Sequence, residues 1–108
     1  MYTVVETAGY LRDAEDIGLG EAERFAPISR RAENPLAGDL MAGTGRCRKV
    51  RVARPGQGRS GGVRVVTFLV WDGRVMLIAA FAKSRQANLT HAQRNALPRV
   101  TSGLKQED

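Results

Sequence analysis

The pattern of apolar positions predicts a strand followed by a helix at the start of the chain. Residues 2–5 are rich in β-branched side chains and favour a short strand. From Thr7 onward, apolar residues recur at helical spacing, namely Tyr10, Leu11, Ala14 and Ile17. Gly18 supplies a stop, because glycine readily adopts the left-handed conformation that ends many helices. We therefore expect a strand over 2–5 and a helix ending near Gly18.

A second helix is predicted to begin after Gly20 and to end at Asn34-Pro35, because a residue before proline disfavours the α region. Pro27 lies inside this helix and should kink it, since proline removes an interior hydrogen bond. The buried stripe of the helix would contain Phe25, Ile28 and Ala32.

The second half of the chain favours β-structure. Residues 35–45 form a connection rich in glycine, proline and alanine, and residues 55–62 form a glycine-rich loop. An Asp-Gly pair at 72–73 indicates a two-residue hairpin turn. Strands are expected over 47–53, 63–68 and 75–82.

A last helix should begin at Thr90, which pairs with Gln93 as a capping box. Pro98 is expected to break or kink this helix early, with fraying after about Thr101. The predicted order is β-α-α-β-β-β-α. This order indicates an α+β fold with a small, mostly antiparallel sheet, two N-terminal helices and a short C-terminal helix.

Length and charge narrow the possible functions. A chain of 108 residues predicts a single domain over 1–108. Its net charge of +6 is uneven, because residues 1–39 carry −4 and residues 40–108 carry +10. No acidic residue lies between Asp39 and Asp72, whereas this stretch holds Arg46, Arg48, Lys49, Arg51, Arg54, Arg59 and Arg64. Cations mounted on strands beside a glycine loop suit a polyanion, and nucleic acid is the partner they favour.

Other classes of protein are disfavoured. A single cysteine, Cys47, forms no internal disulfide, and with the single histidine, His91, it cannot build a Cys/His metal cluster. No apolar run approaches the length of a membrane span, and no signal-peptide pattern begins the chain. We expect a cytoplasmic protein without metal or cofactor. Cys47 and Trp71 are interpreted as packing residues, and His91 as a surface residue.

The predicted hairpin gathers the cations. A two-residue turn at 72–73 would place Arg64 opposite Phe81, with Lys83 diagonally beside Arg64 on the same face. Period-two alternation also places Lys49 and Arg51 on one face of their strand. If that strand pairs with the 63–68 strand, these four cations converge, with Phe81 among them as a stacking platform for a base.

Such a site could cleave RNA without a metal ion. The 2′-hydroxyl is the nucleophile, arginines stabilise the charge that develops at phosphorus, and a lysine among other cations becomes a candidate proton donor or acceptor. From residue types alone, phosphate binding without catalysis stays the simpler interpretation.

The ordered set of motifs resembles the RelE/HigB superfamily of toxins from bacterial type II toxin–antitoxin systems. The resemblance covers nearly the whole chain. It rests on residues 43–51, on the glycine loop with the following strand at 55–65, on residues 81–84, on Asn88-Leu89-Thr90 and on residues 94–97. It implies a compact α+β fold and a ribosome-dependent mRNA endonuclease. It further implies inhibition by a cognate antitoxin and contact with operator DNA only through the antitoxin complex.

The resemblance also assigns roles to residues. Lys49 and Arg51 match the basic strand pair that contacts the phosphate backbone. Arg64 matches the arginine that stabilises the transition state, and Lys83 matches the basic residue that closes the last strand. Further RNA contacts are expected from Arg48, Arg54, Arg59, Phe81 and Arg85.

Two alternatives stay open. One is a nucleic-acid-binding or co-repressor module that has lost catalysis, and the other is a gyrase-inhibiting member of the same superfamily. The general base is also open, because some members carry a catalytic tyrosine near the C-terminus, whereas the tyrosines here are Tyr2 and Tyr10.

Overall fold

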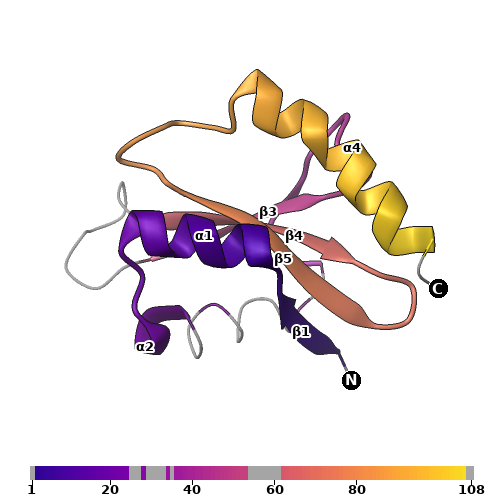
Figure 1. The fold of residues 1–108 in the computed structure, drawn as a ribbon, viewed down its shortest axis with the longest axis horizontal. Helices are drawn as coiled ribbons and strands as arrows, with labels where there is room; N and C mark the ends of the chain where they lie inside the picture. Colours follow the sequence, from indigo (N-terminus) through magenta and orange to yellow (C-terminus); the bar gives the residue numbers. More distant parts are fainter. Residues whose placement is uncertain (1, 25–27, 29–33, 35, 54–61, 107–108) are drawn as a thin grey trace.

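The protein is built on one five-stranded sheet. The computed structural model describes residues 2–24, 28, 34, 36–53 and 62–106. Along the sheet the strands follow the order β1-β5-β4-β3-β2, in which β1 runs parallel to β5 and the other neighbours are antiparallel (Figure 1). This arrangement confirms the mostly antiparallel α+β fold. The strands are β1 Thr3–Glu6, β2 Asp39–Leu40, β3 Arg48–Val52, β4 Val63–Leu69 and β5 Arg74–Ala82.

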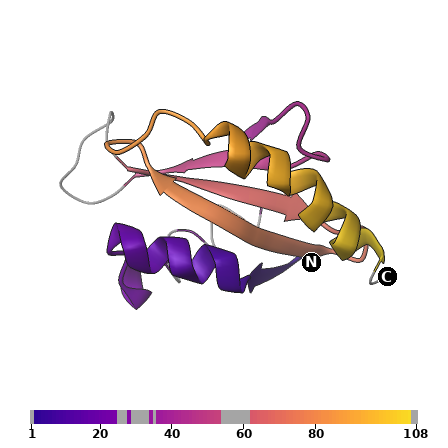
Figure 2. The ribbon, with the colours of Figure 1, turned by 45° about the horizontal axis from the view of Figure 1, so that its top comes forward.

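Helices cover both faces of the sheet. Helix α1 (Ala8–Ile17) packs on one face and helix α4 (His91–Gln106) on the other (Figure 2). A short helix α2 (Glu21–Glu23) follows α1. Among the described helices, none is both long enough and apolar enough to cross a bilayer.

The boundaries of α1 confirm the sequence prediction. Its N-cap is Thr7, whose hydroxyl accepts a hydrogen bond from the Tyr10 amide at 3.2 Å. Its end is Gly18, at φ 87°, whose amide donates to the Ala14 and Glu15 carbonyls. The following helix also begins after Gly20 as predicted, and Ile28 is buried. Phe25, Pro27, Ala32 and Pro35 lie outside the described residues.

The hairpin joining β4 and β5 has the predicted register at its far end, but not for the predicted reason. The Val70 amide donates to the Arg74 carbonyl and the Gly73 amide to the Val70 carbonyl, so the loop contains three residues, 71–73. The two-residue turn was therefore wrong. Near the loop Thr67 pairs with Leu77, but beyond it Val66 pairs with Ala79. Ile78 is the extra residue, and this bulge restores the predicted pairing.

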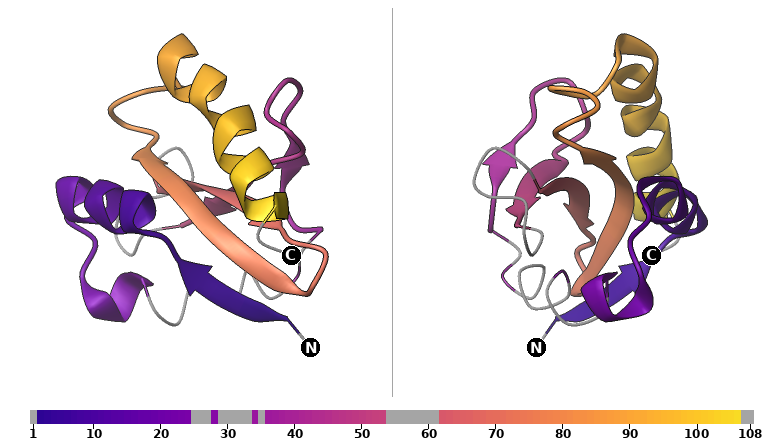
Figure 3. Two further views of the ribbon diagram at one scale, coloured as in Figure 1. Left: turned by 45° about the vertical axis from the view of Figure 1, so that its right-hand side comes forward. Right: turned by 90° about the vertical axis from the view of Figure 1, so that its left-hand side faces the viewer.

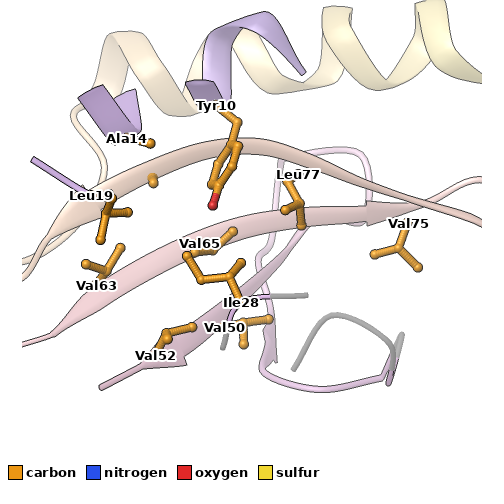
Figure 4. Packing of buried hydrophobic residues seen from close by; sticks show 11 residues of the cluster. Tyr10, Ala14, Leu19, Ile28, Val50, Val52, Val63, Val65, Val75 and Leu77 are labelled. Atoms are coloured by element: carbon orange, nitrogen blue, oxygen red, sulfur yellow. The ribbon is translucent and has the colours of Figure 1, made fainter. Parts of the chain in front are cut away.

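Alternating residues of the strands supply two cores. Val63 and Val65 face α1 in a cluster with Tyr10, Leu77 and Ile28 (Figure 4). Even-numbered residues of β4 face the other way, toward α4. Two of them, Val66 and Phe68, belong to a second cluster. Its other members are Met41, Cys47, Val70, Met76, Ile78 and Leu97. Both faces of β4 are therefore covered along most of its length.

Helix α4 corrects one prediction. Its capping box is confirmed, because the Gln93 amide donates to the Thr90 hydroxyl at 3.1 Å and the Thr90 amide donates to the Gln93 side chain at 2.9 Å. However, α4 continues through Pro98 to Gln106 instead of breaking. Its buried residues Leu97 and Thr101 anchor both sides of the proline. The β2–β3 loop packs against this turn at Gly45 (Figure 3).

An aspartate of α1 completes the edge of β5. Strand β1 ends opposite Leu77, so β5 continues beyond its parallel neighbour. There the Ala80 amide donates to the Asp13 carboxylate at 3.0 Å. Burial raises the pKa of Asp13, and the charge of Asp16 adds to this effect, whereas the Ala80 hydrogen bond and Arg12 oppose it.

This contact predicts different results for two substitutions of Asp13. Asp13→Ala should destabilise the protein by about 1–3 kcal/mol, because the buried Ala80 amide loses its acceptor. Asp13→Asn keeps an acceptor oxygen and removes the charge. Because the pKa of Asp13 is raised by folding, the wild type should lose stability relative to Asp13→Asn as the pH rises through that pKa. Urea unfolding between pH 3 and 7 measures this, and a pH-independent difference would contradict it.

Candidate nucleic-acid interface

Two arginines lie side by side on the α4 face of the sheet. Arg51 of β3 pairs with Arg64 of β4, and Arg64 pairs with Phe81 of β5, so the three residues form one row across the strands. Lys49 lies two residues from Arg51 and therefore on the same face. We call Lys49, Arg51 and Arg64 the cationic row. Its assembly on one face agrees with the sequence prediction.

Arg64 is the most constrained member of the cationic row. Its side chain is only 9% exposed, and among the described residues its buried Nη1 atom has no hydrogen-bond partner. Burial lowers the pKa of Arg64, and the facing charge of Arg51 lowers it further. A buried guanidinium nitrogen that no described residue partners is unusual and requires an explanation. An anion drawn to Arg64 would relieve both the lost solvation and the repulsion from Arg51.

Lys49 contacts a loop that sequence reasoning did not assign to the site. Its Nζ donates to the Asn88 side-chain oxygen at 3.4 Å, and the same oxygen accepts the Leu89 amide at 2.9 Å. Gln86 fixes this loop by donating to the Asn88 carbonyl at 2.8 Å. One signal in the sequence could have indicated this loop. The capping box fixes where α4 begins, and therefore which residues form the loop before it.

The carboxylate of Asp39 borders the cationic row. Asp39 of β2 is the register partner of Lys49, so it lies at the edge of the same face. The sequence placed residues 39–40 in an irregular connection, and strand β2 was missed because two residues carry no detectable periodicity. Asp39 marks where the positive surface ends.

Lys83 lies just beyond β5. Its amide donates to the Gly62 carbonyl at 3.2 Å, which continues the β4–β5 register by one pair, and its side chain is exposed. The backbone therefore places Lys83 two residues along from Phe81, at the end of the strand that borders Arg64. Its chemical role stays a prediction.

Phe81 corrects the sequence interpretation. It is opposite Arg64 as predicted, but it is only 3% exposed. A ring so buried does not offer a free face on which a base could stack. Burial of Phe81 depends on tertiary packing, which strand alternation alone does not report.

Two other predicted RNA contacts point elsewhere. Arg48 is on the opposite face of β3 from Lys49, and its guanidinium donates to the Gly38 carbonyl at 3.2 Å. Arg85 donates to the Asp16 carbonyl at 3.0 Å, at the end of α1, where it lines a polar cavity of about 150 Å³. Neither belongs to the cationic row. Arg54 and Arg59 lie outside the described residues.

The remaining reactive side chains lie away from the cationic row. Cys47 is fully buried, and burial raises its pKa to about 11, so the packing interpretation is confirmed. Tyr10 of α1 is fully buried between this helix and the sheet, where burial and then Glu6 raise its pKa. Its hydroxyl therefore faces the wrong core to act beside Arg64. Trp71 contradicts its predicted packing role, because it is 75% exposed. His91 is exposed as predicted.

The described residues do not gather a metal site, since no group of three or more His, Cys, Asp or Glu side chains comes together among them. The family model for the RelE toxin of the RelE/RelB toxin–antitoxin system matches residues 4–107. The chain belongs to the RelE toxin family. Toxins of this family generally cleave mRNA, and membership implies a cognate antitoxin. For a RelE-family toxin, the cationic row is the natural candidate for the RNA site.

Proposed function

We propose that this RelE-family toxin is a metal-independent endoribonuclease that cuts mRNA on the ribosome. The observation that carries the proposal is the buried Nη1 atom of Arg64, which has no hydrogen-bond partner among the described residues, together with the neighbouring charge of Arg51. Arg64 is already desolvated, and the exposed Arg51 lies beside it, so the pair is prepared for a phosphate with developing charge.

The reaction begins with the 2′-hydroxyl of the substrate, which loses its proton and attacks the adjacent phosphorus. The bond from phosphorus to the 5′-oxygen breaks, and that oxygen takes up a proton as it leaves. The products are a 2′,3′-cyclic phosphate and a free 5′-hydroxyl. Arg64 stabilises the pentavalent phosphorus, while Lys49 and Arg51 hold neighbouring phosphates. Lys83 supplies or removes a proton at the strand end next to this row.

The direct test compares reporter mRNA on translating ribosomes with the same mRNA free in solution. We expect cleavage on ribosomes only, in the presence of a chelator, with cyclic phosphate at the new 3′ ends. Salt-sensitive RNA binding without any cleavage would instead identify the catalytically silent binding module.

Two substitutions at one position separate the roles of Lys83. Lys83→Met should slow cleavage by about 10²-fold or more if the ammonium transfers a proton. Lys83→Arg keeps the charge but holds its proton firmly at neutral pH. The arginine variant should therefore be slow as well. If Lys83→Arg cleaves at the wild-type rate, Lys83 contributes charge alone, and if both variants do, Lys83 lies outside the site.

A further inference from the structure

A second concave surface lies at the opposite end of β4 from Arg64. It is a cavity of about 440 Å³ lined by Arg46, Phe68, Leu69 and Trp71. Phe68 is four residues from Arg64, which separates the two sites by roughly 13 Å along an extended strand. The proposed cleavage reaction makes no use of this cavity.

The lining of this cavity is apolar and accessible. Trp71 is 75% exposed and Leu69 is 38% exposed, whereas Phe68 is buried. Exposed large apolar side chains beside a cavity mark interaction surfaces, and tryptophan and arginine are the residues most enriched among the strong contacts of protein interfaces. The tip of the hairpin therefore presents an anchor for another protein.

The arginine at the rim is held in an unusual conformation. Arg46 has φ 81°, and it is the one non-glycine residue with positive φ in the part of the chain that the structure describes. The loop enforces this conformation through Thr44, whose hydroxyl donates to the Met41 carbonyl at 2.6 Å and accepts the Cys47 amide at 3.1 Å. Backbone strain maintained at an exposed residue points to a functional requirement for that side chain.

Charge indicates what this surface accepts. The one acidic side chain of the hairpin tip, Asp72, is bound by Arg74 at 2.8 Å. Arg46, by contrast, has no ion-pair partner among the described residues, so the rim of the cavity is positive. An apolar floor with a single cation at its edge fits a bulky apolar side chain that is followed by a carboxylate. Nucleic acid fits less well, because the phosphate-binding groups gather at the other end of the sheet.

We propose that this cavity is a docking site for the antitoxin, which inserts an apolar side chain against Trp71 and Leu69 and pairs a carboxylate with Arg46. The site anchors the antitoxin away from the cationic row. The proposal rests on membership of the toxin family and not on nuclease activity, so its test does not depend on cleavage.

Trp71 is the single tryptophan of the chain and therefore reports on the cavity directly. The probe is the cognate antitoxin, in a form without tryptophan. Its binding should shift the emission of Trp71 to shorter wavelength as water leaves the ring. In calorimetry, Trp71→Ala should weaken binding about thirtyfold or more. Leu36→Ala is the matched control, because Leu36 is 68% exposed but lies outside the cavity, and it should bind like the wild type.

Arg46 gives a second and independent test. Arg46→Gly should raise the thermal midpoint, because glycine adopts positive φ without strain, yet it should weaken antitoxin binding about tenfold. Arg46→Lys keeps the charge and should retain most of the affinity. The proposal is overturned if Trp71 emission does not change in the antitoxin complex, or if Trp71→Ala and Arg46→Gly bind like the wild type. It is also overturned if an RNA oligonucleotide shifts the emission and the antitoxin does not.

Discussion

Arg64→Met is expected to slow cleavage by orders of magnitude while making the folded protein more stable. The guanidinium of Arg64 is desolvated, faces the like charge of Arg51 and has no partner for Nη1 among the described residues. Methionine fills a similar volume without a charge. Removing the charge should raise the free energy of unfolding by about 1 kcal/mol. Removing the donor should slow cleavage by about 10²–10³-fold, as the loss of one transition-state contact does in other enzymes.

Three measurements decide this prediction. Urea unfolding gives stability, the ribosome assay gives rate, and a thermal melt with added sulfate gives anion binding. Sulfate should stabilise the wild type more than Arg64→Met, because it binds the folded protein at that guanidinium. Arg12→Met is the control, because Arg12 is exposed on α1 at the other face of the sheet and should change neither the cleavage rate nor the stabilisation by sulfate. If Arg64→Met cleaves at the wild-type rate, the reaction takes place elsewhere on the protein.

The stability result carries separate information. If Arg64→Met loses stability, the desolvation and repulsion attributed to the guanidinium are offset by other contacts of this side chain. A gain of stability together with loss of cleavage would instead show that the fold retains an unfavourable buried charge for the sake of its chemistry. Such a trade between stability and activity is characteristic of active sites.

Strand alternation predicted the cationic row well, because it depends only on which residues share a face. The same rule separates Arg48 from Lys49, although Arg48 was expected to contact RNA as well. The pairing of Arg64 with Phe81 was right despite a wrong turn. A three-residue loop and a bulge at Ile78 shift the register in opposite directions and cancel. Asp-Gly signals a hairpin without fixing the loop length, and nothing in an apolar run announces a bulge.

Other outcomes were decided by packing between distant segments. Pro98 was expected to break or kink α4, but the helix runs unbroken through it, because contacts of Leu97 and Thr101 with the sheet and the β2–β3 loop hold the helix on both sides. Phe81 was expected to be accessible for stacking and is buried, whereas Trp71 was expected to pack and is exposed. Aromatic residues suit both settings, so the sequence alone could not assign them.

Gly38→Ala is expected to destabilise the protein far more than an alanine at a second glycine of the same conformation. Gly38 has φ +82°, and its backbone lies directly against β3. A Cβ atom at this position would overlap the carbonyl oxygen of Lys49 and lie 2.8 Å from the carbonyl carbon. The obstacle is backbone, so no change of rotamer can relieve it. Either the 36–38 segment or β3 must move.

Gly43 provides the matched comparison for this substitution. It has φ +74°, but a Cβ there would meet no atom within 4 Å. Gly43→Ala should therefore cost only the strain of the left-handed conformation, about 1–2 kcal/mol. Gly38→Ala adds displacement of β3, for a total of about 3 kcal/mol or more. Urea unfolding gives both values, and equal losses would contradict the close approach. Because Lys49 belongs to the displaced strand, only Gly38→Ala should also slow cleavage at temperatures where both variants are folded.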